Sequence, residues 1–326
     1  MKRMRSILSL PAILLCLAAS GCTPGGVAGG GAAGGAVATA EGNGNGPLRI
    51  VATTAQVADI LTSIGGEHVS VEVLMGPGVD PHLYKATPGD TRKLNGAQAV
   101  FYSGLHLEGR LADLLESLAA RKPSFAVTEG VKAEQPDLLR TAAQFEGAYD
   151  PHVWFDVALW SKCADHAAKQ LIKIDPKHAA EHRQAADKYL KRLDALHGWC
   201  GTELAKIPKD RRVLVTAHDA FEYLGAAYEI EVHGMQGIST VDEPDLEAVN
   251  GLVSLLVERQ IKAVFVESSV APKNVQALIE GCASRGHEVT IGGELYSDAM
   301  GTPGTPAGTY EGMIKHNVNT IVKALR

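Results

Sequence analysis

Residues 48–75 read LRIVATTAQVADILTSIGGEHVSVEVLM, which is a strand, a helix and a second strand in immediate succession. The β-branched runs at 48–54 and 69–75 predict the strands, and the segment up to about Ile64 predicts the helix between them. A strand, a helix and a strand in this order form a βαβ unit, whose two strands lie parallel in one sheet. The stretch therefore predicts an α/β fold with a parallel sheet.

The same alternation continues toward the C-terminus. Short β-branched runs predict further strands, and a stripe of leucines predicts a helix at 107–120. The further strands are expected at 97–103, 124–128, 212–216, 228–232, 263–267 and 288–291, and further helices at 245–259 and 272–285. Strands that alternate with helices indicate parallel sheets in both halves of the chain.

The middle of the chain has a different pattern. Asp175-Pro176 is a favourable helix start, with Asp as the N-cap and Pro at the first helical position. The charged stretch that follows carries an apolar stripe and would form a helix about 45 Å long. We expect 176–206 to be one long, rigid helix that joins two α/β lobes, 48–175 and 207–326.

The composition is that of an average globular protein. Of 326 residues, 45% are hydrophobic and 21% are charged, which excludes a fully disordered chain and a protein with several membrane spans. The net charge is -6, and it becomes -9 without the three cations among the first five residues. Nucleic-acid binding is not expected, because it requires a basic surface. The acidic balance suits a protein that attracts cations.

The N-terminus resembles a bacterial lipoprotein signal. Positive residues precede the apolar run Ile7–Ala19, which is too short to span a bilayer. Small residues followed by Cys22 resemble a lipobox, which implies that residues 1–21 are a signal peptide and that Cys22 carries lipid. The alternative is an ordinary signal peptide followed by an incidental cysteine.

A glycine-rich segment follows the lipobox. Residues 23–46 contain 10 glycines and six alanines, so we predict that 22–47 is a flexible linker with a reach of roughly 27 Å. Signal and linker together predict an exported protein anchored by lipid to a membrane, in the periplasm or at the cell surface. Beyond the linker, the cysteines are Cys163, Cys200 and Cys282. An odd number without a CxxC pair favours neither a thiolate metal site nor a disulfide framework, and no disulfide pair can be chosen.

Two histidines share one local phrase. Asp80-Pro81-His82 and Asp150-Pro151-His152 are both followed, after one residue, by an aromatic side chain. Proline fixes the backbone just before the histidine. The aspartate can cap a turn or orient the imidazole through a hydrogen bond. The repetition makes both histidines candidate metal ligands.

Two more candidates follow predicted strands of the second half. His218 comes directly after the strand at 212–216, and Asp298 follows the strand at 288–291 and a short loop. Ligands of open α/β sheets bind beyond the carboxyl ends of the strands. Three imidazoles and one carboxylate would close a tetrahedral site that suits Zn²⁺, and suits Mn²⁺ less well. An enzyme would keep one position open for water.

The chain resembles a family at these residues, the TroA-like zinc/manganese solute-binding lipoproteins of bacterial ABC transporters. The resemblance covers roughly residues 48–326. It is carried by Gly78-Val-Asp-Pro-His82, Asp150-Pro-His-Val-Trp154, Val215-Thr-Ala-His-Asp-Ala-Phe221, Phe265-Val-Glu-Ser-Ser269 and Gly292-Gly-Glu-Leu-Tyr-Ser-Asp-Ala-Met-Gly301.

The resemblance implies both the fold and the function. The four metal ligands of the family fall on His82, His152, His218 and Asp298, in a cleft between two α/β lobes bridged by one long helix. A non-enzymatic monomer would then capture a transported ion, Zn²⁺ in preference to Mn²⁺, and deliver it to a permease in the cytoplasmic membrane. The zinc branch often carries a His-rich loop, which residues 107–151 lack, whereas the manganese branch usually has Glu at the position of His218.

A rival reading rests on His178-Ala-Ala-Glu181-His182, which matches the H-x-x-E-H pattern of inverted zincins. In that reading the chain is an exported zinc-dependent hydrolase with Glu181 as general base. We expect instead that the motif lies on a solvated face of the charged helix. A third function, as an adhesin, has no sequence feature that tests it.

Three other polar residues stand near predicted strand ends. Glu267 ends the strand at 263–267 and is a candidate for orienting a metal ligand. His106 and Glu108 are expected to stay outside the site.

Overall fold

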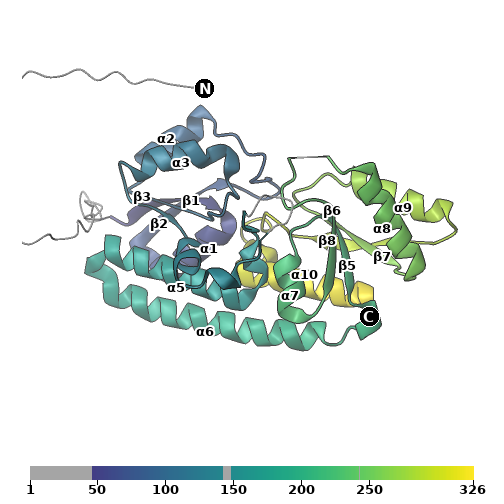
Figure 1. The fold of residues 1–326 in the computed structure, drawn as a ribbon. Helices are drawn as coiled ribbons and strands as arrows, with labels where there is room; N and C mark the ends of the chain where they lie inside the picture. The colour runs from purple at the N-terminus through teal and green to yellow at the C-terminus, as the bar shows by residue number, and fades with distance from the viewer. Residues whose placement is uncertain (1–45, 142–147, 242) are drawn as a thin grey trace, which may run out of the picture. The chain divides into compact units, whose positions relative to one another are not determined.

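The stretch at 48–75 forms two parallel strands with a helix between them (Figure 1). The computed structural model describes residues 46–141, 148–241 and 243–326, all of which lie in one unit. Strand β1 (Leu48–Thr54) pairs in parallel with β2 (Val69–Met75), and α1 (Ala55–Gly65) connects them. The Thr54 side chain caps α1 by accepting a hydrogen bond from the backbone N–H of Val57.

The first half is a four-stranded parallel sheet in the order β2-β1-β3-β4. Its other elements are α2 (Pro88–Gly96), β3 (Ala99–Tyr102), α3 (Ala112–Ala119), β4 (Ser124–Ala126), α4 (Glu129–Glu134) and α5 (Val157–Ile174). Successive side chains of a strand point to opposite faces. Ile50 and Ala52 therefore pack with α1 and α5, whereas Val51 and Val100 pack with leucines of α2 and α3.

The second half has parallel pairs β5–β6 and β7–β8, with β5 and β7 in contact. Its elements are β5 (Val213–His218), α7 (Glu222–Tyr228), β6 (Glu231–Gln236), α8 (Leu246–Glu258), β7 (Ala263–Glu267), α9 (Lys273–Ser284), β8 (Thr290–Leu295) and α10 (Tyr310–Leu325). Alternation again separates two layers: Val213 and Val215 pack with α8 and α9, and Leu214 packs into the core that contains α6 (Ala179–Leu204).

The predicted long helix is present as α6 (Ala179–Leu204), preceded by the 3₁₀ turn η6 (Pro176–His178). The prediction of two parallel α/β halves and a long helix is confirmed. One detail is wrong, because the Asp175 side chain does not cap the helix. Its carboxylate instead accepts hydrogen bonds from the side chains of His178 and His182.

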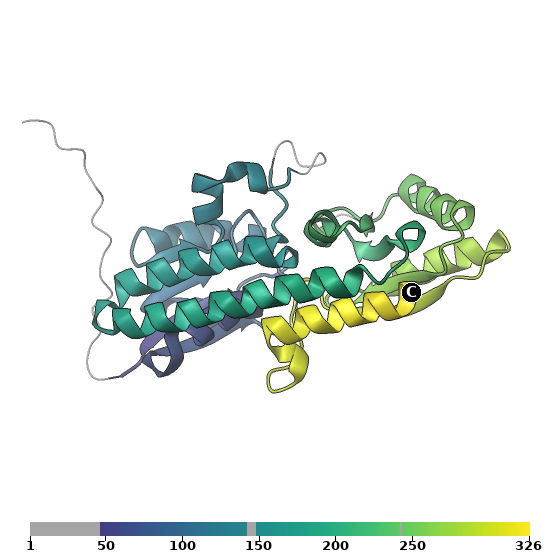
Figure 2. The same ribbon diagram turned by 90° about the horizontal axis from the view of Figure 1, so that it is seen from below.

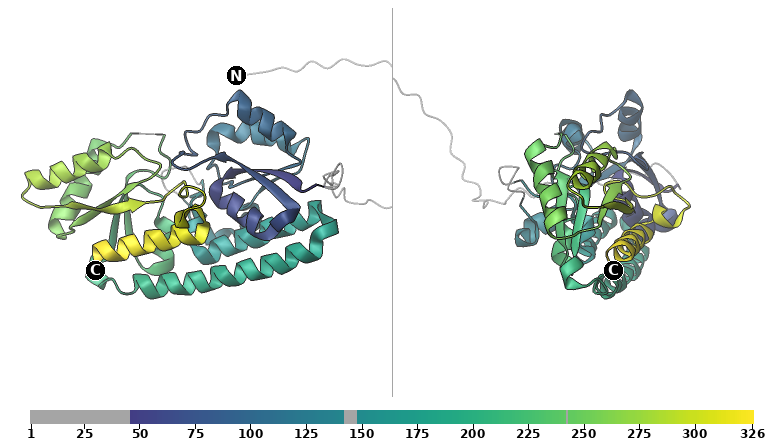
Figure 3. Two further views of the ribbon diagram at one scale, coloured as in Figure 1. Left: turned by 180° about the vertical axis from the view of Figure 1, so that it is seen from behind. Right: turned by 90° about the vertical axis from the view of Figure 1, so that its right-hand side faces the viewer.

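One hydrophobic core extends along α6 through both halves. It combines residues of β1 and α1 with Leu214 of β5, Phe265 of β7 and the buried face of α10. Helices α5 and α10 both pack against α6 (Figure 2), and α10 also packs against β8 (Figure 3). The C-terminal helix α10, which we did not predict, thus adds a second connection between the long helix and the second half.

Four strands begin later than predicted, and two of them, β6 and β8, also end four residues later. The strand expected at 228–232 is β6, because α7 continues to Tyr228 and Glu229 then adopts a left-handed conformation with φ of 58°. The strand expected at 288–291 is β8. It does not end at Ile291 but continues through Gly292 and Gly293 to Leu295. A Cβ on Gly293 would lie 2.4 Å from Cγ2 of Thr320 on α10, so glycine permits this close packing.

Several predictions concern residues that the structure does not describe. The signal peptide at 1–21, Cys22 and nearly all of the linker at 22–47 lie outside the described residues. Within the described part, Cys163, Cys200 and Cys282 are buried free thiols. None of the helices in that part combines the length and the apolar character needed to cross a membrane.

Candidate metal site

The four predicted ligands come from four separate segments. His218 is the last residue of β5, and Asp298 lies three residues beyond β8. His82 lies in the loop between β2 and α2, beyond the carboxyl end of β2. His152 does not follow a strand but immediately precedes the short 3₁₀ helix η5 (Val153–Phe155) that leads into α5.

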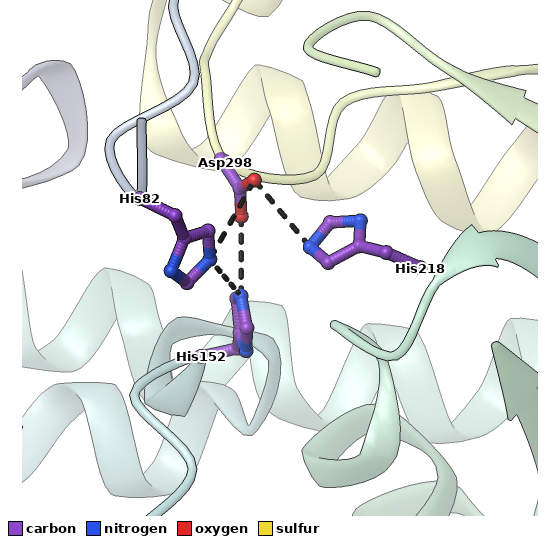
Figure 4. Close-up of side chains that lie close together, drawn as sticks. All are labelled: His82, His152, His218 and Asp298. Carbon is purple, nitrogen blue, oxygen red and sulfur yellow. Dashed lines mark hydrogen bonds and ion pairs between the residues drawn. The ribbon is translucent and has the colours of Figure 1, made fainter. Parts of the chain in front are cut away.

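The structure brings the four side chains together in its interior (Figure 4). His152 Nε2 lies 3.2 Å from His82 Nε2 and 3.2 Å from Asp298 Oδ1. Asp298 Oδ2 lies 3.4 Å from His218 Nε2 and 4.0 Å from His82 Nε2. All four residues are buried, with relative exposures between 0% and 5%.

The distances between the donor atoms fit a small metal ion. Ligand atoms about 2.0–2.1 Å from a tetrahedral Zn²⁺ are separated from one another by about 3.3 Å. Among the described residues, neither His218 Nε2 nor Asp298 Oδ1 has a hydrogen bond of good geometry, and their polar contacts are to other members of the group. Buried polar atoms without partners are costly, so these atoms are suited to receive a ligand.

The repeated Asp-Pro-His phrase has the same local structure in both copies. Asp80 Oδ1 accepts a hydrogen bond of 2.8 Å from the backbone N–H of His82. Asp150 Oδ1 accepts one of 2.9 Å from the backbone N–H of His152. In each copy the aspartate closes a turn that directs the histidine inward.

Carboxylates orient two of the imidazoles. His152 Nδ1 donates to Asp150 Oδ1 at 2.7 Å, and His218 Nδ1 donates to Glu267 Oε2 at 2.5 Å. Glu267 also accepts from the backbone N–H of His218, as expected for a residue that orients a ligand. Because these bonds place a proton on Nδ1, the Nε2 atoms can point their lone pairs toward the centre.

Without an ion, burial and the neighbouring charges shift the pKa values of all four side chains. Burial lowers the pKa of His82 to about 3, so this imidazole is neutral. Burial also acts to lower the pKa of His152, but the carboxylates of Asp150 and Asp298 outweigh it and raise that pKa to about 9. The pKa of His218 is held well above its ordinary value by Glu267 and Asp298, against burial. Burial acts to raise the pKa of Asp298, but the neighbouring histidines hold it well below its usual range.

Other elements fix the ligand loops. Gln56 of α1 donates a hydrogen bond of 2.9 Å to the backbone oxygen of Asp298. Trp154 Nε1 donates one of 3.1 Å to the backbone oxygen of Ser297. Our sequence interpretation missed Gln56, and recorded Trp154 only as the aromatic residue of the repeated phrase.

His106 and Glu108 lie outside the site, as expected. His106 is exposed. Glu108 is buried and accepts hydrogen bonds from the Thr53 hydroxyl and from the backbone N–H groups of Ser103 and Gly104. It therefore serves to hold the end of β3 against β1.

The H-x-x-E-H motif differs from our expectation. His182 is fully buried and does not lie on a solvated helix face, because it packs against Ile64 at the end of α1. Glu181 is exposed, and the two histidines converge on Asp175. The glutamate required as general base therefore does not share a site with the histidines.

Comparison with known proteins identifies the family. The sequence model of the ZnuA family, described as zinc-uptake complex component A, periplasmic, matches residues 50–324. The chain belongs to this family. The manganese-binding lipoprotein MntA of Bacillus subtilis (strain 168) is 52% identical over 279 residues, which cover 86% of this chain and 90% of that protein.

A zinc-binding relative is similar in both sequence and structure. The zinc-binding protein TroA of Treponema pallidum (strain Nichols) is 43% identical over 276 residues, which cover 85% of this chain and 88% of that protein. The solved structure of the periplasmic zinc binding protein TroA from Treponema pallidum has a TM-score of 0.82 and 42% identity, and the match covers 86% of this chain and 99% of that one.

Family membership decides between the two readings of the sequence. The family consists of substrate-binding proteins of ABC transporters, and its members are not enzymes. The suggested hydrolase at His178, Glu181 and His182 has no support from these relatives. The names of the relatives include both manganese and zinc, so the ion is argued below from the residues of this chain.

Proposed function

We propose that this protein captures a divalent transition-metal ion outside the cytoplasm and delivers it to the permease of an ABC importer. The proposed ligands are His82, His152, His218 and Asp298. One observation carries the proposal: four buried donor atoms from four separate segments lie within 4.8 Å of one another. Because all four positions would be filled by the protein, the site suits binding and release better than catalysis.

We further propose that Zn²⁺ is preferred to Mn²⁺. Three imidazole nitrogens and one carboxylate suit a tetrahedral zinc ion, whereas Mn²⁺ prefers more oxygen ligands. The orientation of His152 by Asp150, and of His218 by Glu267, supports strong nitrogen donors. The names of the relatives include both metals, so the choice rests on the donor set of this chain.

Metal competition tests this function. The purified protein is stripped with a chelator and dialysed against Zn²⁺, against Mn²⁺, and against mixtures of the two, and bound metal is quantified. We expect one tight equivalent of Zn²⁺, which is lost in His82→Ala and in His152→Ala. The control is His233→Ala, because His233 is a partly exposed histidine on β6 paired with Glu231. Tight binding that survives both ligand substitutions would refute the assignment.

We also propose that Cys22 is the point of lipid attachment and that residues 1–21 are removed. The lipobox-like sequence and the glycine-rich segment support this, as do relatives named as lipoproteins. Cys22→Ser should move the protein from the detergent phase to the aqueous phase in a partitioning experiment. Unchanged partitioning would exclude attachment at Cys22.

A further inference from the structure

A second group of metal-binding side chains lies at the start of α6. Asp175 Oδ2 is 2.8 Å from His178 Nδ1 and 3.0 Å from His182 Nε2. Asp175 and His182 are buried, and the side chain of His178 is 24% exposed. Apart from the site described above, this is the one group in the described part of the chain whose donor atoms meet in this way.

Neighbouring residues fix the orientation of both imidazoles. His182 Nδ1 lies 3.3 Å from the backbone oxygen of Ile64, so a proton on Nδ1 can be donated there while Nε2, which is directed at Asp175, binds an ion. A backbone partner on the other ring nitrogen is the usual arrangement around metal-bound histidines. The ring of His68 stacks on that of His178, with 3.8 Å between centroids and 16° between planes, and so limits the rotation of His178.

We infer that Asp175, His178 and His182 form a second, weaker site for a divalent cation of the zinc class. Two imidazole nitrogens and one carboxylate oxygen are the donors that Zn²⁺ takes where one position stays open. The two separations from Asp175 Oδ2 must widen by about 0.3–0.5 Å to reach the tetrahedral value of about 3.3 Å, and all three donor atoms lie within 4.8 Å of one another. The exposed edge of His178 lets solvent supply the fourth ligand.

The second site is separate from the site proposed for the transported ion, which we call the cargo site and which consists of His82, His152, His218 and Asp298. His68 precedes Val69, which pairs with Leu48 at the amino end of β1 and β2. The cargo ligand His82 follows the carboxyl end of β2. A seven-residue strand is about 23 Å long, so opposite ends of the sheet hold the two groups. No residue belongs to both groups, and each can therefore be altered alone.

The affinity and selectivity of this site follow from its donors. Three protein ligands, one of them partly exposed, should bind more weakly than the four buried ligands of the cargo site. With two nitrogens and one oxygen, affinity should follow the usual order for divalent ions, so Zn²⁺ and Co²⁺ bind well ahead of Mn²⁺. The second site is thus a zinc-class site even where the cargo is manganese.

Zinc titration of variants tests the inference. The full chain, stripped of metal, is titrated with Zn²⁺ by calorimetry and should show one tight and one weaker class of sites. His178→Gln should weaken the second class at least tenfold and leave the tight class unchanged. The matched control is His233→Gln, because His233 contacts one carboxylate, that of Glu231, without a third ligand among the described residues. Both classes should persist in this control.

Other outcomes of the titration would contradict the second site. A single class of sites in the wild type would overturn the inference, as would a weaker class that survives His178→Gln or disappears in His233→Gln. A spectroscopic experiment needs no variant. Protein with one equivalent of Zn²⁺ at the tight site is titrated with Co²⁺, which should produce the intense visible absorption of four-coordinate cobalt. Only the weak absorption of hydrated Co²⁺ would show that the second site is absent.

Discussion

Thr240 donates a side-chain hydrogen bond of 2.5 Å to Oδ2 of Asp80, which lies 160 residues earlier in the sequence. The other carboxylate oxygen of Asp80 accepts the backbone N–H of His82. A loop after β6 of the second half therefore holds the turn that carries a proposed ligand of the first half. The bond requires both loops to be close together, so it should stabilise the form in which the four ligands converge.

Removing this hydrogen bond should accelerate metal release. Thr240→Val keeps the shape of the side chain but removes the hydroxyl, whereas Thr240→Ser keeps the hydroxyl and is the control. A hydrogen bond to a charged group is worth about 1.5 kcal/mol or more. We expect dissociation of Zn²⁺ to be roughly tenfold faster in the valine variant, as measured by stopped-flow transfer to a chelator. Equal rates in both variants would show that the bond does not retain the ion.

Metal binding should release protons. His152, with its pKa raised to about 9, is protonated in the metal-free protein at pH 7.5, and coordination requires its neutral form. The raised pKa of His218 acts in the same direction. We expect at least about one proton per Zn²⁺, measured by calorimetry in buffers with different ionisation enthalpies. Affinity should rise with pH up to about 9. A heat of binding independent of the buffer would contradict the assignment.

Whereas the affinity for Zn²⁺ should rise with pH, the stability of the metal-free protein should fall. A histidine whose pKa is raised by folding stabilises the folded state fully below its ordinary pKa, and this contribution disappears as the pH rises through the raised value. For His152 that window runs from 6.5 to about 9. Urea denaturation of the chelator-treated protein should therefore show stability falling across this range, and falling less in His152→Gln.

Glu267→Gln should weaken metal binding without unfolding the protein. The carboxylate accepts from both the backbone and the ring of His218, and an amide can replace only part of this. Loss of a partner that orients a metal ligand typically costs 10- to 100-fold in affinity. The control is Glu294→Gln, an exposed residue of β8. Wild-type affinity of the Glu267 variant would exclude this role.

Selectivity should depend on residue 218. His218→Glu would exchange a nitrogen for a carboxylate and allow a higher coordination number, which suits Mn²⁺. In the structure, however, the new carboxylate would face Glu267, so the substitution is best combined with Glu267→Gln. We expect the preference for Zn²⁺ over Mn²⁺ to fall at least about tenfold, or roughly 1.4 kcal/mol, relative to Glu267→Gln alone. An unchanged ratio in competition titration would count against His218 as a ligand.

Zinc should raise the melting temperature, because it draws together ligands from both halves. A ligand bound only by the folded state, at a thousandfold excess over its Kd, stabilises the protein by about 4 kcal/mol. His152→Gln should lose most of this rise in calorimetric scans with and without Zn²⁺. A full rise in the variant would place the stabilising ion elsewhere.

Elements whose signals are local could be predicted from the amino-acid sequence. Strands β1, β2 and β7 have the predicted bounds, because their β-branched runs are delimited by turn residues in the sequence itself. The long helix was predicted to within two residues at its C-terminal end, and Pro176 marks the 3₁₀ turn η6 that precedes it. The four residues that the structure brings together were selected from short phrases around strand ends and the repeated Asp-Pro-His.

Features that depend on contacts between distant residues could not be predicted in this way. Strand β8 continues through Gly293 because α10 packs closely there, and His182 is buried because α1 ends against it. The Asp80–Thr240 bond joins residues whose separation in sequence gives no sign of contact. Each of these features arises when separate elements pack together, so neither periodicity nor a local motif could have revealed it.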